Sequence, residues 1–148
     1  MSSLRLFVVD DFEPWRCFVC ARLQEHQYCN ILEISDGQDA VHKAQEQQPD
    51  LILLDIGLPG LNGIEAARQI RKLAPRSKIL FVSENRFSDI AEEALSTGAM
   101  GYVVKSDAGR ELLTAVNTVL QGERFISARL NFPIQAELMG SETPRVEP

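Results

Sequence analysis

Residues 49–63 read PDLILLDIGLPGLNG and give the clearest indication of the fold class. Leu51 to Leu54 form an unbroken aliphatic run, which is typical of a strand buried on both faces in a parallel sheet. Asp55 follows the run directly, and the glycines and prolines after it impose a tight, irregular loop. Open α/β sheets place ligands at this end of their strands. Asp55 is therefore a candidate site residue, with capping of the next turn as the alternative interpretation.

Strand and helix patterns alternate along the rest of the chain. Apolar runs predict strands at 4–9, 30–34, 51–54, 77–82 and 101–104. Helical spacing and stop signals predict helices at about 12–26, 36–47, 63–73, 86–97 and 107–121. Asp11 is placed to cap the first helix, and Asp36 opens the second. The pattern predicts an α/β fold with a doubly wound, five-stranded parallel sheet, helices on both faces and right-handed crossovers.

Length and composition set limits on function. The 148 residues fit one domain with an ordinary globular content of 45% hydrophobic and 24% charged residues. The net charge of −6 opposes broad attraction to nucleic acid or anionic membrane. No apolar run is long enough to cross a membrane, and the start of the chain lacks a signal-peptide pattern. These features predict a cytoplasmic protein that has no membrane partner and does not bind DNA directly.

The pattern also predicts how the chain is divided. Residues 1–122 hold the alternating elements, and residues 123–148 form a tail with a possible short linker helix at 128–139, followed by disorder. The fourth helix has a weak apolar stripe, so we expect it to be loosely held and available to a partner. Cys17 and Cys20 form a CxxC inside the first predicted helix, where ordinary helix cysteines are the favoured interpretation over a redox or zinc site.

Polar side chains follow four of the five predicted strands. Asp10 and Asp11, Asp55, Ser83 and Lys105 stand at strand ends that become neighbours in a doubly wound sheet. Crowded carboxylates tolerate one another when a cation lies between them, and an all-oxygen set selects Mg²⁺ or Mn²⁺. Taken singly, each residue has an ordinary alternative: the aspartates as helix caps, the serine as a common strand-end residue, the lysine as a solvated surface charge.

Together these groups suit phosphoryl transfer. A metal, an ammonium and a hydroxyl can neutralise the three equatorial oxygens of a phosphoryl group, and that reaction asks for little else. A carboxylate would attack and give an acyl phosphate. Asp55 is the best acceptor because it stands alone on its loop, and Gly57 beside it allows a backbone carbonyl to approach the metal.

These residues carry a family resemblance over about residues 4–121. The segments 8–12 (VVDDF), 58–63 (LPGLNG) and 98–105 (GAMGYVVK), together with Asp55 and Ser83, resemble the CheY-like receiver domain of two-component response regulators. The resemblance implies the flavodoxin-like strand order 2-1-3-4-5 for the predicted sheet. Segment 98–105 and the later GERFIS at 122–127 resemble the NarL/FixJ (LuxR-type) branch, which implies transcription regulation. Relatives in that branch carry a C-terminal helix-turn-helix, which these residues do not include.

The resemblance implies a role for each site residue. Asp55 is the phosphoacceptor for a histidine kinase, and Lys105 pairs with the phosphoryl oxygens. Asp11 binds Mg²⁺ directly, Asp10 through water, and Gly57 through its carbonyl. The protein is then a phosphorelay switch and no enzyme beyond its own Mg²⁺-dependent phosphorylation and dephosphorylation.

Ser83 and Tyr102 are the predicted switch residues. A phosphoryl group adds negative charge and strong acceptors. Drawing the Ser83 hydroxyl toward it would vacate space for Tyr102 and change the surface of the fourth helix and fifth strand. The alternative for Tyr102 is a half-buried strand aromatic with its hydroxyl in water.

Four positions depart from the family pattern or leave its details open. Glu84 stands where a small or apolar residue is usual and could obstruct phosphodonors or point to solvent. Asn85 and Gly57 lie where the family tunes the lifetime of the phosphoryl group. Ser106 replaces a frequent proline, so the sequence makes no prediction of a cis peptide.

Two other functions compete with the switch. A receiver-fold interaction module that ignores phosphorylation has Glu84 as its support. An aspartyl-phosphate phosphatase would need a second acid two residues after the nucleophile, and Gly57 occupies that position. The switch could form a homodimer through the fourth helix, fifth strand and fifth helix, or through the first and fifth helices.

Overall fold

A single parallel sheet forms the centre of the computed structural model, which describes residues 3–128 and 130. The strands are β1 (Arg5–Val9), β2 (Asn30–Ile34), β3 (Leu51–Leu54), β4 (Lys78–Ser83), β5 (Gly101–Val104) and β6 (Phe125–Ile126). They lie in the order β2-β1-β3-β4-β5-β6, and every adjacent pair is parallel. The predicted order 2-1-3-4-5 is confirmed, and a sixth strand that the sequence did not predict extends it.

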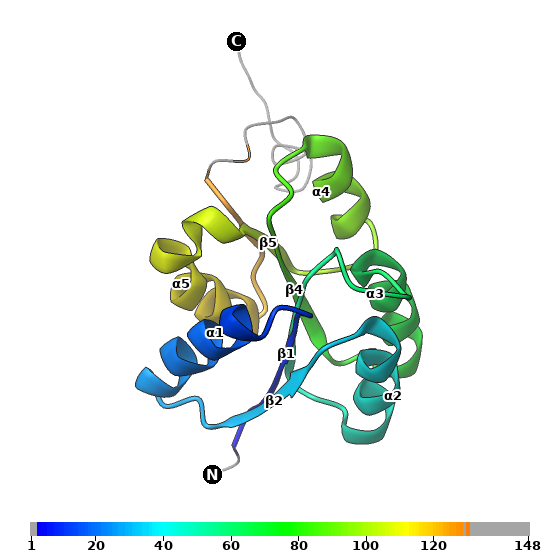
Figure 1. The fold of residues 1–148 in the computed structure, drawn as a ribbon, viewed down its shortest axis with the longest axis horizontal. Helices are drawn as coiled ribbons and strands as arrows, with labels where there is room; N and C mark the ends of the chain where they lie inside the picture. Colours follow the sequence, from blue (N-terminus) through cyan, green and yellow to red (C-terminus); the bar gives the residue numbers. More distant parts are fainter. Residues whose placement is uncertain (1–2, 129, 131–148) are drawn as a thin grey trace.

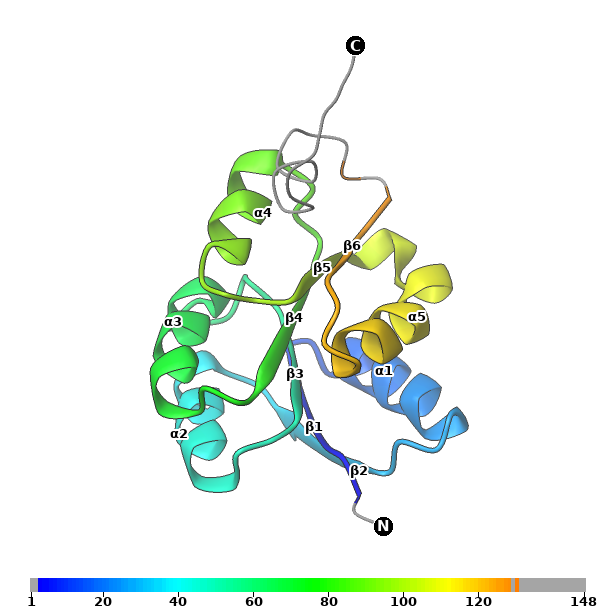
Figure 2. The same ribbon diagram turned by 180° about the vertical axis from the view of Figure 1, so that it is seen from behind.

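The helices form two layers around this sheet (Figures 1 and 2). One layer holds α1 and α5, and the other holds α2, α3 and α4. A short 3₁₀ turn, η1 (Lys105–Asp107), leads from β5 into α5. The helices run over Glu13–Glu25 (α1), Gly37–Gln47 (α2), Gly63–Leu73 (α3), Ser88–Leu95 (α4) and Ala108–Leu120 (α5). Among the described residues, no helix has the length and apolarity that crossing a bilayer requires.

Alternation along the strands divides the core between the two layers. In β1, Phe7 and Val9 belong to the cluster under α2, α3 and α4, whereas Leu6 and Val8 belong to the cluster under α1 and α5. All four side chains are at most 2% exposed. Successive side chains of a strand point to opposite faces, so a strand covered on both faces must be apolar throughout. The aliphatic run at 51–54 follows this rule as β3.

Helix starts show which acids act as caps. The prediction for Asp36 is confirmed, because its Oδ1 accepts the Asp39 N–H at 2.8 Å. The prediction for Asp11 is wrong. The N-cap of α1 is Phe12, without a side-chain cap, and Asp10 Oδ1 accepts the Phe12 N–H at 2.9 Å. The turn after β1 thus uses the first acid of the pair and leaves the second exposed.

The fourth helix is shorter than predicted. It spans Ser88–Leu95 instead of about 86–97, and it buries Ala91, Ala94 and Leu95 with Ile90 only partly covered. Asn85 Oδ1 accepts the Phe87 N–H at 3.1 Å, which gives the residues before the helix a turn of their own. Such local side-chain bonds compete with helix formation.

The predicted tail at 123–148 begins with β6, which pairs with β5 through Gly101 and Tyr102. Of the predicted linker helix at 128–139, only residues 128 and 130 are described, and the rest lies outside the described residues. Cys17 and Cys20 lie in α1 as free thiols, and Cys29, which lies between α1 and β2, is also a free thiol.

Candidate functional site

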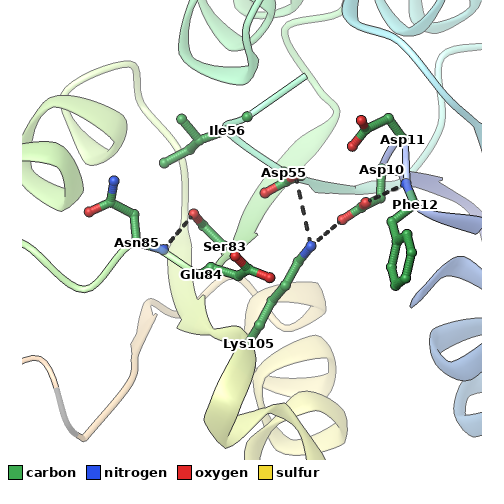
Figure 3. Close-up of a pocket in the computed structure, with 10 residues that line it drawn as sticks. Asp10, Asp11, Phe12, Asp55, Ile56, Ser83, Glu84, Asn85 and Lys105 are labelled. Atoms are coloured by element: carbon green, nitrogen blue, oxygen red, sulfur yellow. Dashed lines mark hydrogen bonds and ion pairs between the residues drawn. The ribbon is translucent and has the colours of Figure 1, made fainter. Parts of the chain in front are cut away.

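A pocket of about 340 Å³ opens at the carboxyl ends of the central strands (Figure 3). It collects side chains from the ends of β1, β3, β4 and β5, which are far apart in sequence. The pocket is lined by Asp10, Asp11, Phe12, Asp55, Ile56, Gly57, Ser83, Glu84, Asn85 and Lys105. The predicted meeting of acids, hydroxyl and amine therefore occurs in one place.

Asp55 is held by backbone bonds on both sides of its loop. The Asp55 N–H donates a hydrogen bond to the Val9 carbonyl at 3.1 Å. After the loop, the Gly63 N–H donates a hydrogen bond to the Ile56 carbonyl at 2.8 Å. A Cβ on Gly63 would lie 1.9 Å from the Asp55 carbonyl oxygen, so only glycine allows this approach. The loop and the start of α3 thus fix the Asp55 backbone, while its carboxylate faces the pocket (Figure 3).

The Asp55 carboxyl has an altered acidity. Burial raises its pKa to about 6, and the negative charge of Asp10 adds to the increase. Lys105 and hydrogen bonds from the backbone of Ile56 and Gly57 act in the opposite direction. Desolvation dominates because the residue is only 9% exposed.

Lys105 crosses the pocket and joins two of the acids. Its Nζ donates to Asp10 Oδ2 at 2.6 Å and lies 3.8 Å from Asp55 Oδ2 (Figure 3). Its ammonium also lies 5.0 Å from the ring centroid of Trp15, within cation–π range. The lysine side chain is 12% exposed and the Asp10 side chain 2%, so this pair is largely removed from water. A buried charge needs such a partner.

The three aspartates form a compact oxygen cluster. One carboxylate oxygen from each of Asp10, Asp11 and Asp55 can lie within 4.8 Å of the others. Hard divalent cations prefer such all-oxygen donor sets, and Mg²⁺ is bound through a few carboxylates with water completing its shell. The donor chemistry therefore fits Mg²⁺ or Mn²⁺, and Gly57 lines the same pocket.

A second set of contacts leads from the pocket toward β5. The Asn85 N–H donates to Ser83 Oγ at 3.0 Å, and the Tyr102 hydroxyl donates to the Asn85 carbonyl at 2.7 Å. Tyr102 is fully buried, and burial raises the pKa of its hydroxyl. This contradicts the alternative of a half-buried tyrosine with its hydroxyl in water.

Some contributors to the site were not predicted. Phe12 and Ile56 line the pocket, Trp15 lies beside Lys105, and Arg16 donates through Nη1 to the Asp10 carbonyl at 2.7 Å. Trp15 lies in α1 and packs against the apolar cluster under α1 and α5. Its contact with the lysine has no local signal, because 90 positions separate the two residues.

Sequence comparison shows what the chain is similar to. Residues 6–117 match the family model of the response regulator receiver domain. Transcriptional activator protein ExaE of Pseudomonas putida is 35% identical over 100 residues, which cover 68% of this chain and 47% of that protein. Response regulator GacA of Pseudomonas viridiflava is 30% identical over 128 residues, which cover 86% of this chain and 60% of that protein. The chain thus spans about half to three fifths of the length of these relatives.

Solved structures give the same result. A two-component response regulator of the LuxR family from an Aurantimonas species has a TM-score of 0.81 at 31% identity, covering 94% of this chain and 100% of that chain. The receiver domain of the putative response regulator NarL from Mycobacterium tuberculosis has a TM-score of 0.74 at 27% identity, covering 83% of this chain and 100% of that chain. The resemblance to LuxR/NarL-type regulators is therefore confirmed. The chain belongs to the receiver-domain family of two-component response regulators.

Proposed function

We propose that this protein accepts a phosphoryl group on Asp55 from a histidine kinase and thereby changes its partner-binding surface. The observation that carries the proposal is the pocket, in which Asp55 lies with two further acids, Ser83 and Lys105. The name of one relative, transcriptional activator protein ExaE, supports a role in transcription regulation. We place the protein in the cytoplasm, with a homodimer as a possible assembly and no direct DNA contact by residues of this chain.

The transfer exchanges one bond to phosphorus for another. An Asp55 carboxylate oxygen bonds to the phosphorus as the P–N bond to the kinase histidine breaks, and the leaving imidazole takes up a proton. Lys105 and the Ser83 hydroxyl would neutralise phosphoryl oxygens during this step. Asp10, Asp11, Asp55 and the Gly57 carbonyl would hold Mg²⁺ or Mn²⁺, which supplies further charge neutralisation when bound. The protein's only catalysis would be its own phosphorylation and dephosphorylation.

Intact-mass measurement tests the acceptor. After incubation with acetyl phosphate and Mg²⁺, we expect the wild-type chain to gain about 80 Da, the mass of one phosphoryl group replacing a proton. Asp55→Asn should gain nothing, because an amide oxygen is a poor nucleophile. An adduct on both proteins would place the acceptor elsewhere. No adduct on either, with beryllofluoride also failing to bind, would favour the phosphorylation-independent interaction module.

Glu84 gives a prediction about access to the site. Its exposed carboxylate lines the same pocket and adds negative charge near the path of an anionic donor. We expect Glu84→Ala to be labelled by acetyl phosphate about two- to five-fold faster, with the gain shrinking as salt is added. Labelling rates from intact mass measure this effect, and Glu92→Ala on α4 is a matched exposed control. Equal rates for Glu84→Ala and wild type would show that this carboxylate points away from the donor's path.

A further inference from the structure

The segment that follows α5 is fastened to the edge of the sheet. We call residues 125–128 and 130 the edge segment. The Phe125 N–H donates to the Met100 carbonyl at 3.1 Å, and the Ser127 N–H donates to the Tyr102 carbonyl at 2.9 Å. Figure 2 shows β6 beside β5, on the border between α4 and α5. The edge segment therefore continues the sheet where β5 would otherwise be the last strand.

Ser127 connects this segment to both β5 and α5. Its Oγ accepts the Val104 N–H at 3.0 Å and donates to Glu111 Oε1 at 2.5 Å. Glu111 Oε2 also accepts the Ala128 N–H at 3.3 Å. Ser127 is fully buried, so its hydroxyl has exchanged water for protein partners.

Apolar packing holds the segment from both faces. Phe125 packs against the cluster under α1 and α5, whereas Ile126 and Leu130 join the cluster that contains Tyr102 and the buried side of α4. Leu130 is only 1% exposed. A Cβ on Gly101 would lie 2.6 Å from the Phe125 carbonyl oxygen, so β5 has a glycine where the segment comes closest.

Consecutive hydrogen bonds join this segment to the pocket. Ser83 Oγ in the pocket accepts from Asn85, whose carbonyl accepts from the Tyr102 hydroxyl. The Tyr102 carbonyl in turn accepts a hydrogen bond from the Ser127 N–H. Each of these three hydrogen bonds involves a backbone group, and the Tyr102 side chain that connects them is fully buried. A movement of the loop after β4 would therefore act on the hydrogen bond between Tyr102 and Ser127.

We infer that the edge segment occupies the surface formed by β5, α4 and α5, and that its attachment to this surface is coupled to phosphoryl loading of Asp55. This inference rests on the proposed function. A phosphoryl group would accept a hydrogen bond from the Ser83 hydroxyl, whose oxygen already accepts the Asn85 N–H. The added hydrogen bond would hold Ser83 in place, and with it the Asn85 carbonyl that accepts from the Tyr102 hydroxyl. Loading would therefore tighten the attachment of the edge segment to β5. By linkage, loosening the segment must weaken loading by the same factor.

Hydrogen exchange with beryllofluoride and Mg²⁺, a stand-in for the phosphoryl group, tests the coupling in the full chain. We expect loading to slow exchange of the Ser127 and Leu130 amides by about five-fold or more. Fluorine NMR of bound beryllofluoride measures the loaded fraction independently. A loaded site with unchanged exchange at these amides would overturn the coupling and leave the proposed function intact. No bound beryllofluoride would overturn the proposed function itself.

Variants test the reverse direction of the linkage. Leu130→Ala should weaken beryllofluoride binding by about five-fold, because it loosens the segment without touching the pocket. Leu23→Ala is the matched control: it removes a buried leucine of α1 from the opposite cluster and should leave the affinity unchanged. Tyr102→Phe should leave the segment packed while reducing the exchange response to loading. Equal affinities of wild type and Leu130→Ala, with faster exchange of Ser127 in the variant, would contradict the coupling.

Discussion

Asp55→Asn is expected to stabilise the metal-free protein at about pH 8 by ~1–3 kcal/mol, an increase in Tm of several degrees. Burial raises the pKa of the Asp55 carboxyl from 3.8 to about 6, so the folded protein holds this proton more tightly than the unfolded chain does. Between those two values the unfolded state binds fewer protons than the folded state. Stability therefore falls as the pH rises through this window, and the penalty is complete above about pH 6.

The variant removes the charge that causes this penalty. Its free energy of unfolding should converge with that of the wild type near pH 4, where Asp55 is protonated in the folded protein, and exceed it above pH 6. Urea unfolding at a series of pH values in the presence of a chelator measures the difference. Asp89→Asn, which removes an exposed carboxylate from α4, is the control and should show no such trend. Adding Mg²⁺ should stabilise the wild type more than Asp55→Asn. A pH-independent difference would show that burial of the charge is not its cause.

Local chemistry made most of the fold predictable. The run at 51–54 is apolar on both faces because β3 is covered by helices on both sides. Asp36 indicated a helix start because its side chain can cap the first turn. These signals act over a few residues. The alternation of strands and helices predicted a parallel sheet with right-handed crossovers, and the resemblance to receiver domains implied the strand order.

The predictions that failed depended on contacts that no local pattern encodes. A two-residue strand such as β6 carries no period of its own, and it exists because β5 supplies Gly101 and a row of backbone partners. The choice between Asp10 and Asp11 as the acid that bonds the helix start depended on how the chain turns after β1. Propensity and spacing were the same for both residues.

The site was predictable to the level of which residues meet, and no further. Strand ends identified Asp55, Ser83 and Lys105, since parallel strands deliver their carboxyl ends to one edge. The sequence could not show that Lys105 bonds Asp10 more closely than Asp55, at 2.6 Å against 3.8 Å. Nor could it show that the Tyr102 hydroxyl uses the Asn85 carbonyl, because that acceptor is present at every residue.

Lys105→Met is expected to move metal binding and phosphoryl transfer in opposite directions. The ammonium of Lys105 donates to Asp10 Oδ2 in the metal-free protein and thereby competes with a cation for the acidic cluster. Methionine preserves most of the side-chain length and removes the charge. Without the Lys105 ammonium, the carboxylates of Asp10 and Asp55 lose their buried counter-ion. The acidic cluster should then bind Mg²⁺ about ten-fold more tightly, because a buried charge without a partner is costly.

The same substitution should slow labelling by acetyl phosphate by about 10²–10³-fold, the loss that typically follows removal of one donor from a developing negative charge. Calorimetric titration with Mg²⁺ and labelling rates at saturating Mg²⁺ separate the two effects. Lys105→Arg keeps a positive charge and should retain weak metal binding, while its different shape restores little of the rate. Weaker Mg²⁺ binding in Lys105→Met would mean that the lysine organises the cluster for the metal instead of competing with it. An unchanged labelling rate would remove Lys105 from the transfer step and leave it as the counter-ion of Asp10.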